Sequence, residues 1–228
     1  MPRFLMLFAF SALALAACGG DSASTTGSVA TATAESGSSS ESLPAPEGSL
    51  AGEPMVLGNP DADVVLIEYA SVTCPACAAF HAQVMPTLKE KYIDEGKIRF
   101  EYREFPTAPA DLAQFGFSLA RCAATDRGAP AYFAVLDMLY ARQREWAYGE
   151  DRITVLENIA KQAGVEDQFL DCPFREDIAG AIEDNIITAK TEDNVTATPT
   201  LILNGEKVSW NSVESLTGQI DAALAATN

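Results

Sequence analysis

The alternation of apolar and polar residues predicts one folded region that starts near Met55. Val64–Ile67 is a continuous apolar run that extends to Ala70, which is typical of a strand covered on both faces. Apolar residues at every fourth position predict a helix after this strand; they are Phe80, Val84, Leu88 and Tyr92. Pro86 lies inside this helix, and we expect a kink there because proline cannot donate the helical hydrogen bond.

The pattern beyond this helix predicts further strands and helices in a defined order. They are a strand at 98–105, a largely helical block from about 108 to 190, a strand at 200–203, a return strand at 208–210 and a helix from 215 to about 226. Pro106 ends the first of these strands, and Asn204-Gly205 is a strong signal for a two-residue hairpin turn. The order predicts an α/β core with a helical insertion in its middle.

The N-terminus predicts export from the cytoplasm. Arg3 precedes an apolar run, Phe4–Ala17, which is too short to cross a bilayer and fits the core of a signal peptide. The run ends in Leu15-Ala16-Ala17-Cys18, which resembles the lipobox of bacterial lipoproteins. This resemblance implies that residues 1–17 are a lipoprotein signal peptide and that Cys18 is lipidated. The alternative is an ordinary signal peptide with a chance cysteine, and either membrane of an envelope could hold the anchor.

The segment after Cys18 predicts a tether. Residues 19–53 are mostly Gly, Ser, Thr and Ala, and they carry too few large apolar side chains to form a core. A flexible chain of about 35 such residues spans roughly 30–35 Å. We therefore expect a lipidated cysteine plus a disordered tether over 18–53, and one folded domain over 54–228.

Charge and cysteine content narrow the function classes. The formal net charge of −17 argues against a nucleic-acid partner, whose phosphates an acidic surface repels. Five cysteines are present, and four remain once Cys18 is set aside. An even number in an exported chain is typical of two disulfides, because that compartment is oxidising.

The sequence Cys74-Pro75-Ala76-Cys77 lies where the first helix begins. Free backbone amides and the helix dipole at that end stabilise a thiolate on Cys74, and Pro75 needs no hydrogen-bond partner there. Cys77 follows one turn later and can form a disulfide with Cys74. We predict that Cys74 is the exposed, attacked sulfur and Cys77 the buried resolving one. A zinc site and a purely structural disulfide are the alternatives; zinc would require two further ligands.

Two segments around this pair resemble the DsbA-like disulfide oxidoreductases. Val65–Cys77 is similar to the active-site region of that family, and the likeness continues through Phe80-His81 and Val84–Tyr92. Val195–Leu201 is similar to its cis-proline loop. The resemblance, of alphaproteobacterial type, implies a thioredoxin-like α/β fold with a helical domain at about 107–190, inserted between the second core strand and the cis-proline strand.

The resemblance also implies roles for single residues. Glu68 matches a buried acidic residue of the family, which can move protons to and from Cys77. Pro199 is expected to be cis, and Thr198 to offer its backbone to an extended substrate, with its side chain near the sulfurs. The alternatives are an exposed Glu68 at a strand end and an ordinary turn at Thr198-Pro199. His81 could tune the site, although we expect it to be a partly exposed surface residue.

One departure from the family affects the expected redox strength. The strongest oxidants of the family carry a histidine between the two cysteines, whereas Pro75-Ala76 stands here. The helix dipole, backbone amides and Thr198 then remain to stabilise the Cys74 thiolate. We therefore expect a less depressed pKa for Cys74 and a less extreme oxidant.

The other two cysteines, Cys122 and Cys172, fall in the helical block. Some DsbA-like proteins carry a second disulfide in that region, so the resemblance implies a structural bond between them. The alternative is two separately buried thiols.

The function that the resemblance implies is dithiol–disulfide exchange on exported proteins. We expect a monomer on the periplasmic side of a bacterial envelope, which introduces disulfides into extended or unfolded substrates and needs no metal or cofactor. A membrane quinone-linked partner of DsbB type would reoxidise it. The rival functions are disulfide reduction or isomerisation and, in a different class, a thiol-based metallochaperone. The single histidine of the chain counts against the metallochaperone.

Overall fold

The computed structural model describes residues 42–227. The predicted signal peptide, Cys18 and most of the predicted tether lie outside the described residues. The described part belongs to one compact unit. Within it, no helix combines the length and the apolar character needed to cross a membrane.

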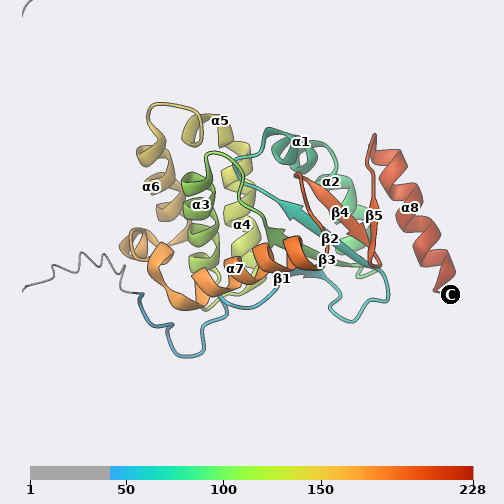
Figure 1. Cartoon of the computed structure of the whole chain (residues 1–228), viewed down its shortest axis with the longest axis horizontal. Helices are drawn as coiled ribbons and strands as arrows, with labels where there is room; N and C mark the ends of the chain where they lie inside the picture. Colours follow the sequence, from blue (N-terminus) through green and yellow to red (C-terminus); the bar gives the residue numbers. More distant parts are fainter. Residues whose placement is uncertain (1–41, 228) are drawn as a thin grey trace, which may run out of the picture. The chain divides into compact units, whose positions relative to one another are not determined.

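A five-stranded mixed sheet is the centre of this unit, with the strand order β1-β3-β2-β4-β5 (Figure 1). The strands are β1 (Met55–Gly58), β2 (Val65–Ala70), β3 (Arg99–Glu104), β4 (Thr200–Leu203) and β5 (Glu206–Val208). β2 and β3 are parallel, whereas β1, β4 and β5 each pair antiparallel to their neighbours. The central position of β2 agrees with its apolar sequence, since both of its faces are covered.

The helices fall into a group near the sheet and a group in the insertion. The first group is α1 (Pro75–Gln83), α2 (Met85–Leu88), a π-helical turn η1 (Lys89–Ile93) and α8 (Val213–Ala226). The second is α3 (Ala110–Ala123), α4 (Ala129–Ala141), α5 (Gln143–Trp146), α6 (Arg152–Ala163), the short 3₁₀ turns η2 (Glu166–Gln168) and η3 (Cys172–Phe174), and α7 (Glu176–Thr191). From β2 onward the predicted order of elements is observed, with a helical insertion after the second predicted strand; the edge strand β1 was not predicted.

The two faces of β2 belong to different parts of the core. Leu66, Glu68 and Ala70 alternate on one face and lie in the larger core with residues of α1 and α8. Ile67 and Tyr69 point to the opposite face, where α7 packs (Figure 1). Glu68 is therefore an acidic side chain placed inside an apolar layer.

Local sequence signals explain where several elements begin and end. The first helix breaks at Val84, two residues before Pro86, as the predicted kink requires. Asn204 and Gly205 adopt φ values of 49° and 85°, which is the left-handed backbone that a two-residue hairpin needs. The predicted return strand at 208–210 is wrong, because such a tight turn pairs Glu206 with Leu203 at once.

A buried ion pair joins the insertion to the sheet. Arg121 of α3 donates from Nε and Nη2 to Glu104 at the end of β3, at 2.7 and 2.9 Å, and both side chains are buried. Tyr132 of α4 donates to the same carboxylate at 2.9 Å. Bidentate geometry and additional donors are what a buried pair needs to offset the cost of desolvation.

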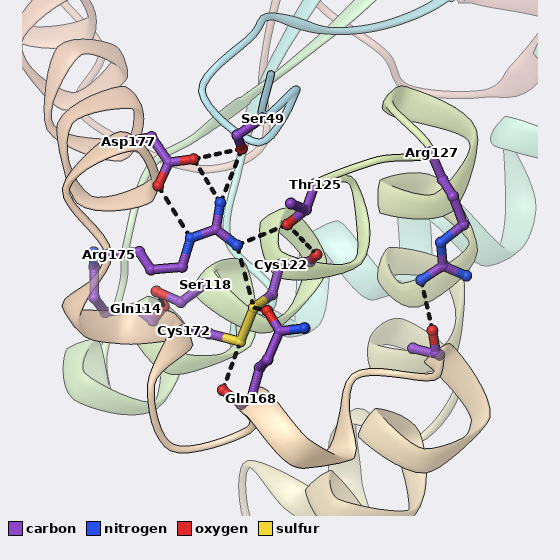
Figure 2. The surroundings of a disulfide bond; sticks show 11 residues. Ser49, Gln114, Ser118, Cys122, Thr125, Arg127, Gln168, Cys172, Arg175 and Asp177 are labelled. Atoms are coloured by element: carbon purple, nitrogen blue, oxygen red, sulfur yellow. Dashed lines mark hydrogen bonds and ion pairs between the residues drawn. A yellow bond between two sulfur atoms is a disulfide. The ribbon is translucent and has the colours of Figure 1, made fainter. Parts of the chain in front are cut away.

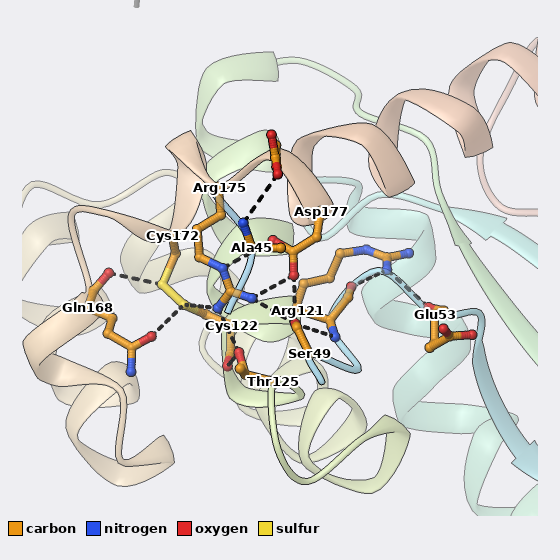
Figure 3. Close-up of polar contacts among 12 residues, drawn as sticks. Ala45, Ser49, Glu53, Arg121, Cys122, Thr125, Gln168, Cys172, Arg175 and Asp177 are labelled. Carbon is orange, nitrogen blue, oxygen red and sulfur yellow. Dashed lines mark hydrogen bonds and ion pairs between the residues drawn. A yellow bond between two sulfur atoms is a disulfide. The ribbon is translucent and has the colours of Figure 1, made fainter. Parts of the chain in front are cut away.

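The folded region starts earlier than the predicted residue 54. Arg121 Nη1 donates to the carbonyls of Ala51 and Glu53, at 2.7 and 3.1 Å. Figure 3 shows Arg121 beside Glu53. Ser49 donates to Asp177 at 2.6 Å, and Leu43 pairs with Arg175 in a short bridge. These contacts are made mainly by backbone and small polar groups. The shortage of large apolar residues therefore led to the prediction of a tether over this segment.

The disulfide implied between Cys122 and Cys172 is formed, with a Cα–Cα distance of 5.7 Å. Figure 2 shows the guanidinium of Arg175 between this bond and the side chains of Ser49 and Asp177. Arg175 donates to Thr125 at 2.7 Å and to Ser49 at 2.9 Å, and its Nη1 lies 3.9 Å from the Cys122 sulfur. The disulfide thus fixes η3 on α3 at the place where the N-terminal segment docks.

Replacing both Cys122 and Cys172 by alanine should destabilise the domain. The bond closes a loop with a sequence separation of 50, and loss of its constraint on the unfolded chain costs about 4 kcal/mol at most. Guanidinium denaturation should therefore show a lower midpoint for the double variant. Each single variant should lose a similar amount, and an unchanged midpoint would contradict a structural role for this disulfide.

Candidate active site

Cys74 occupies the N-cap of α1, directly after the turn that follows β2. Its backbone is extended, with φ −82° and ψ 119°, and its sulfur accepts the backbone N–H of Cys77 at 3.4 Å. Pro75 fills the first helical position, where its missing N–H costs nothing. Cys74 is half-buried and Cys77 is fully buried, and neither is in a disulfide in this structure. This is the predicted arrangement of the two sulfurs.

The surroundings of Cys74 favour its thiolate. Its pKa is lowered to about 5, mainly by the hydrogen bond from the Cys77 thiol, which outweighs the opposing effect of partial burial. Hydrogen bonds from the Thr198 side chain and from the backbone of Cys77 and Ala76 lower the pKa further. At neutral pH Cys74 is therefore an ionised nucleophile.

The surroundings of Cys77 have the opposite effect. Its pKa is raised far above that of an ordinary thiol, first by burial, then by its hydrogen bond to Cys74, and then by the negative charge of Glu68. Cys77 is therefore a protonated thiol when the pair is reduced. The two sulfurs are one helical turn apart and differ in protonation state, which suits the predicted roles of Cys74 as the attacked sulfur and Cys77 as the resolving one.

The cis-proline loop lies against Cys74. The Thr198–Pro199 peptide bond is cis, as predicted, and the Thr198 carbonyl oxygen lies 3.4 Å from the Cys74 sulfur. Sheet pairing of β4 begins only at Thr200, opposite Tyr69, so Thr198 precedes the ladder. Thr198 is half-buried beside the reactive sulfur. The geometry brings the predicted pair Thr198-Pro199 to the site.

The insertion contacts the active-site turn through two residues that the sequence did not indicate. Gln143 of α5 is buried and donates from Nε2 to the carbonyls of Val72 and Cys74, at 2.8 and 3.0 Å. Tyr148 donates to the carbonyl of Thr73. A polar residue in a helical block carries no signal for such a contact, because the contact forms only in three dimensions. These donors hold the turn that presents Cys74.

Glu68 and His81 form a buried pair behind Cys77. Glu68 is fully buried, as predicted, and its Oε2 lies 2.9 Å from Nε2 of His81. The expectation that His81 is a partly exposed surface residue is wrong, because only 8% of it is exposed and its ring stacks on Tyr140 at 4.1 Å. The reason is that α4 packs over the helix face that carries Cys77 and His81, four residues apart.

Comparisons with known proteins agree with this geometry. Residues 50–222 match the model of a thioredoxin family. A Rickettsia conorii protein with the provisional name protein-disulfide oxidoreductase is 31% identical over 172 residues, which cover 75% of this chain and 60% of that protein. The chain thus matches less than two thirds of the length of this rickettsial relative.

Solved structures show the same fold. The crystal structure of alpha-DsbA1 from Wolbachia pipientis is 28% identical, has a TM-score of 0.68, and is matched over 76% of this chain and 92% of its own. BdbD from Bacillus subtilis is 18% identical, with a TM-score of 0.65 over 81% of this chain and 99% of its own, and shows likeness of fold. The predicted thioredoxin-like fold with its helical insertion is confirmed.

The pH dependence of alkylation should separate the two thiols. Because the thiolate is the reactive form, the iodoacetamide reaction rate of reduced Cys74 should be half-maximal near pH 5 and flat above about pH 6.5. A Cys74→Ser variant leaves Cys77 alone and should stay unreactive in this range. A half-maximal rate above pH 8 for Cys74 would contradict the stabilised thiolate.

Proposed function

Because the chain belongs to the thioredoxin superfamily, as a DsbA-like member, we propose that it is a thiol–disulfide oxidoreductase that introduces disulfides into exported proteins. The observation that carries the proposal is the contrast between the two sulfurs of one CxxC pair. Cys74 is an accessible thiolate with a pKa of about 5, and Cys77 is a buried thiol whose pKa is raised. The pair Cys74–Cys77 is the whole redox centre that this chemistry needs.

The reaction proceeds in two exchanges. A substrate thiolate attacks the Cys74 sulfur of the oxidised pair, the Cys74–Cys77 bond breaks, and Cys77 leaves and takes up a proton through Glu68. A second substrate thiolate then attacks the substrate sulfur of the mixed disulfide, and Cys74 leaves as a stabilised thiolate. The substrate loses two electrons and gains a disulfide, and the enzyme ends as a dithiol.

The proposed direction of electron flow, from substrate to enzyme, follows from the stability of the reduced enzyme. A stable Cys74 thiolate favours the reduced enzyme, which makes the oxidised enzyme an oxidant. A pKa of about 5 lies between the values of about 3.5 for DsbA and about 7 for thioredoxin. An oxidant of intermediate strength agrees with the absence of a histidine between the cysteines, where Pro75-Ala76 stands.

Substrates of this oxidase would be extended or unfolded. The backbone of Thr198 precedes the sheet ladder and lies beside Cys74, so an extended segment could pair there while its cysteine reaches the sulfur. Reoxidation needs an electron acceptor, for which we propose a quinone-linked membrane protein of DsbB type. We propose that the enzyme acts as a monomer.

For the location, we propose the periplasmic side of a bacterial envelope, with a lipid anchor on Cys18. The support is the sequence Leu15-Ala16-Ala17-Cys18 after an apolar run, and the similarity to a protein-disulfide oxidoreductase. The bond from Ser49 to Asp177 places the last residues of the predicted tether on the folded domain, so we propose a tether shorter than 18–53.

Equilibration with glutathione buffers should give a redox potential between about −120 mV, the value of DsbA, and about −270 mV, that of thioredoxin. The Cys77→Ala variant should accumulate mixed disulfides on Cys74 with exported proteins, because the resolving thiol is missing. A Cys74→Ala variant should trap none. A redox potential near that of thioredoxin would contradict the proposed oxidase function and favour a reductase.

The anchor has its own test. In cells, the Cys18→Ala variant should move from the membrane fraction to the soluble periplasmic fraction, with its disulfide exchange activity retained. Labelling with a radioactive fatty acid should mark the wild-type chain only. A variant that stays in the membrane fraction, or a wild-type chain that takes up no lipid, would contradict the proposed lipid anchor on Cys18.

A further inference from the structure

The buried pair of Glu68 and His81 has two polar atoms that the hydrogen bond between them leaves unused. Glu68 Oε1 and His81 Nδ1 are both buried, and neither has a hydrogen-bond partner within residues 42–227. Leaving a buried polar atom unpaired costs about 1–3 kcal/mol. A pair that served packing alone would have no reason to keep one such atom at each end.

The groups that face this pair come from three elements. Cys77 lies on the same helix, Tyr102 comes from β3, and Tyr140 from α4 stacks on the imidazole. Tyr102 and Tyr140 are hydrogen-bonded to each other at 2.8 Å, and burial raises the pKa of both, so both stay neutral. Among the described residues, His81 is the one basic side chain within ion-pair distance of Glu68.

A cavity of about 350 Å³ connects His81 to the surface between α1, α2 and α4. Its lining includes His81 and Tyr140 at the inner end and the ion pair of Lys89 and Asp137, which is partly exposed. The order from the protein surface to the sulfurs is therefore cavity, His81, Glu68 and Cys77. The cavity is large enough to admit water.

We propose that His81 relays protons between solvent in this cavity and Glu68, and thereby controls how fast Cys77 gains and loses its proton. This inference rests on the proposed dithiol–disulfide exchange. His81 acts through Glu68 and touches no sulfur, so it is a positioning residue. The two unpaired atoms are then the two ends of the relay: Glu68 Oε1 exchanges a proton with Cys77, and His81 Nδ1, which is buried in this structure, reaches water in the cavity when the imidazole turns.

The relay balances with the groups present. When a substrate thiolate bonds to Cys74, the electron pair of the broken Cys74–Cys77 bond goes to Cys77. His81 takes a proton from solvent at Nδ1 and gives its Nε2 proton to Glu68, which passes one proton to the Cys77 sulfur. Reoxidation sends a proton outward by the same atoms in reverse. Each full redox cycle therefore returns His81 to its starting tautomer.

The test is the rate at which excess reduced glutathione reduces the oxidised protein, measured by rapid acid quench and mass spectrometry. His81→Gln keeps an N–H donor for Glu68 but cannot pass a proton. We expect this variant to react at least about tenfold more slowly than wild type at a fixed glutathione thiolate concentration. Reoxidation by oxidised glutathione should slow equally, so that the redox potential is unchanged. Gln83→Ala, an exposed change on the same helix, should keep the wild-type rate.

Two measurements separate a relay from a structural role. In the Glu68→Gln background, His81→Gln should have no further effect, because the relay is already interrupted. For wild type, which needs no variant to fold, the glutathione reaction should be slower in D₂O than in H₂O. A wild-type rate for His81→Gln, an undiminished effect in the Glu68→Gln background, or equal rates in both solvents would overturn the relay.

These outcomes also separate the relay from the proposed function. If glutathione fails to reduce the Cys74–Cys77 disulfide of the wild-type protein, the oxidoreductase itself is wrong. If wild type reacts and His81→Gln reacts equally fast, the proposed oxidoreductase function is retained and only the relay is contradicted.

Discussion

The chemistry of this protein depends on one constraint, which is that two sulfurs one helical turn apart lie in opposite environments. The N-cap position gives Cys74 hydrogen bonds and partial access to solvent, whereas Cys77 is buried on the inner face of α1 near a buried carboxylate. The interaction between the sulfurs lowers the pKa of Cys74 and raises the pKa of Cys77. The pair therefore titrates as a unit, with one thiolate and one thiol. Attack, resolution and release follow from this difference.

The rest of the fold maintains that difference. The central strand β2 places Glu68 in the core, and the insertion supports the turn above it through Gln143 and Tyr148. The Arg121–Glu104 pair fixes the insertion to the sheet, and the Cys122–Cys172 disulfide joins η3 to α3 within the insertion. The helical domain thus contacts the turn that carries the reactive sulfur through Gln143 and Tyr148.

The sequence predicted those features whose signal is local or belongs to a known motif. The order of elements, the N-cap cysteine, the Asn204-Gly205 turn and the buried strand all follow from short-range patterns. His81 was misjudged because its burial depends on α4, which is about fifty residues away in the sequence. The docked segment before residue 54 was missed because Arg121 binds its backbone carbonyls, and those leave no trace in residue composition.

The relative stability of the reduced and oxidised forms tests the central claim most directly. The Cys74 thiolate is stabilised in the folded chain alone, since its pKa is about 5 there and ordinary in the unfolded chain. Guanidinium denaturation at pH 7 should find the reduced form more stable than the oxidised form, and the excess should disappear as the pH falls through 5. An oxidised form that is the more stable at pH 7 would contradict the account.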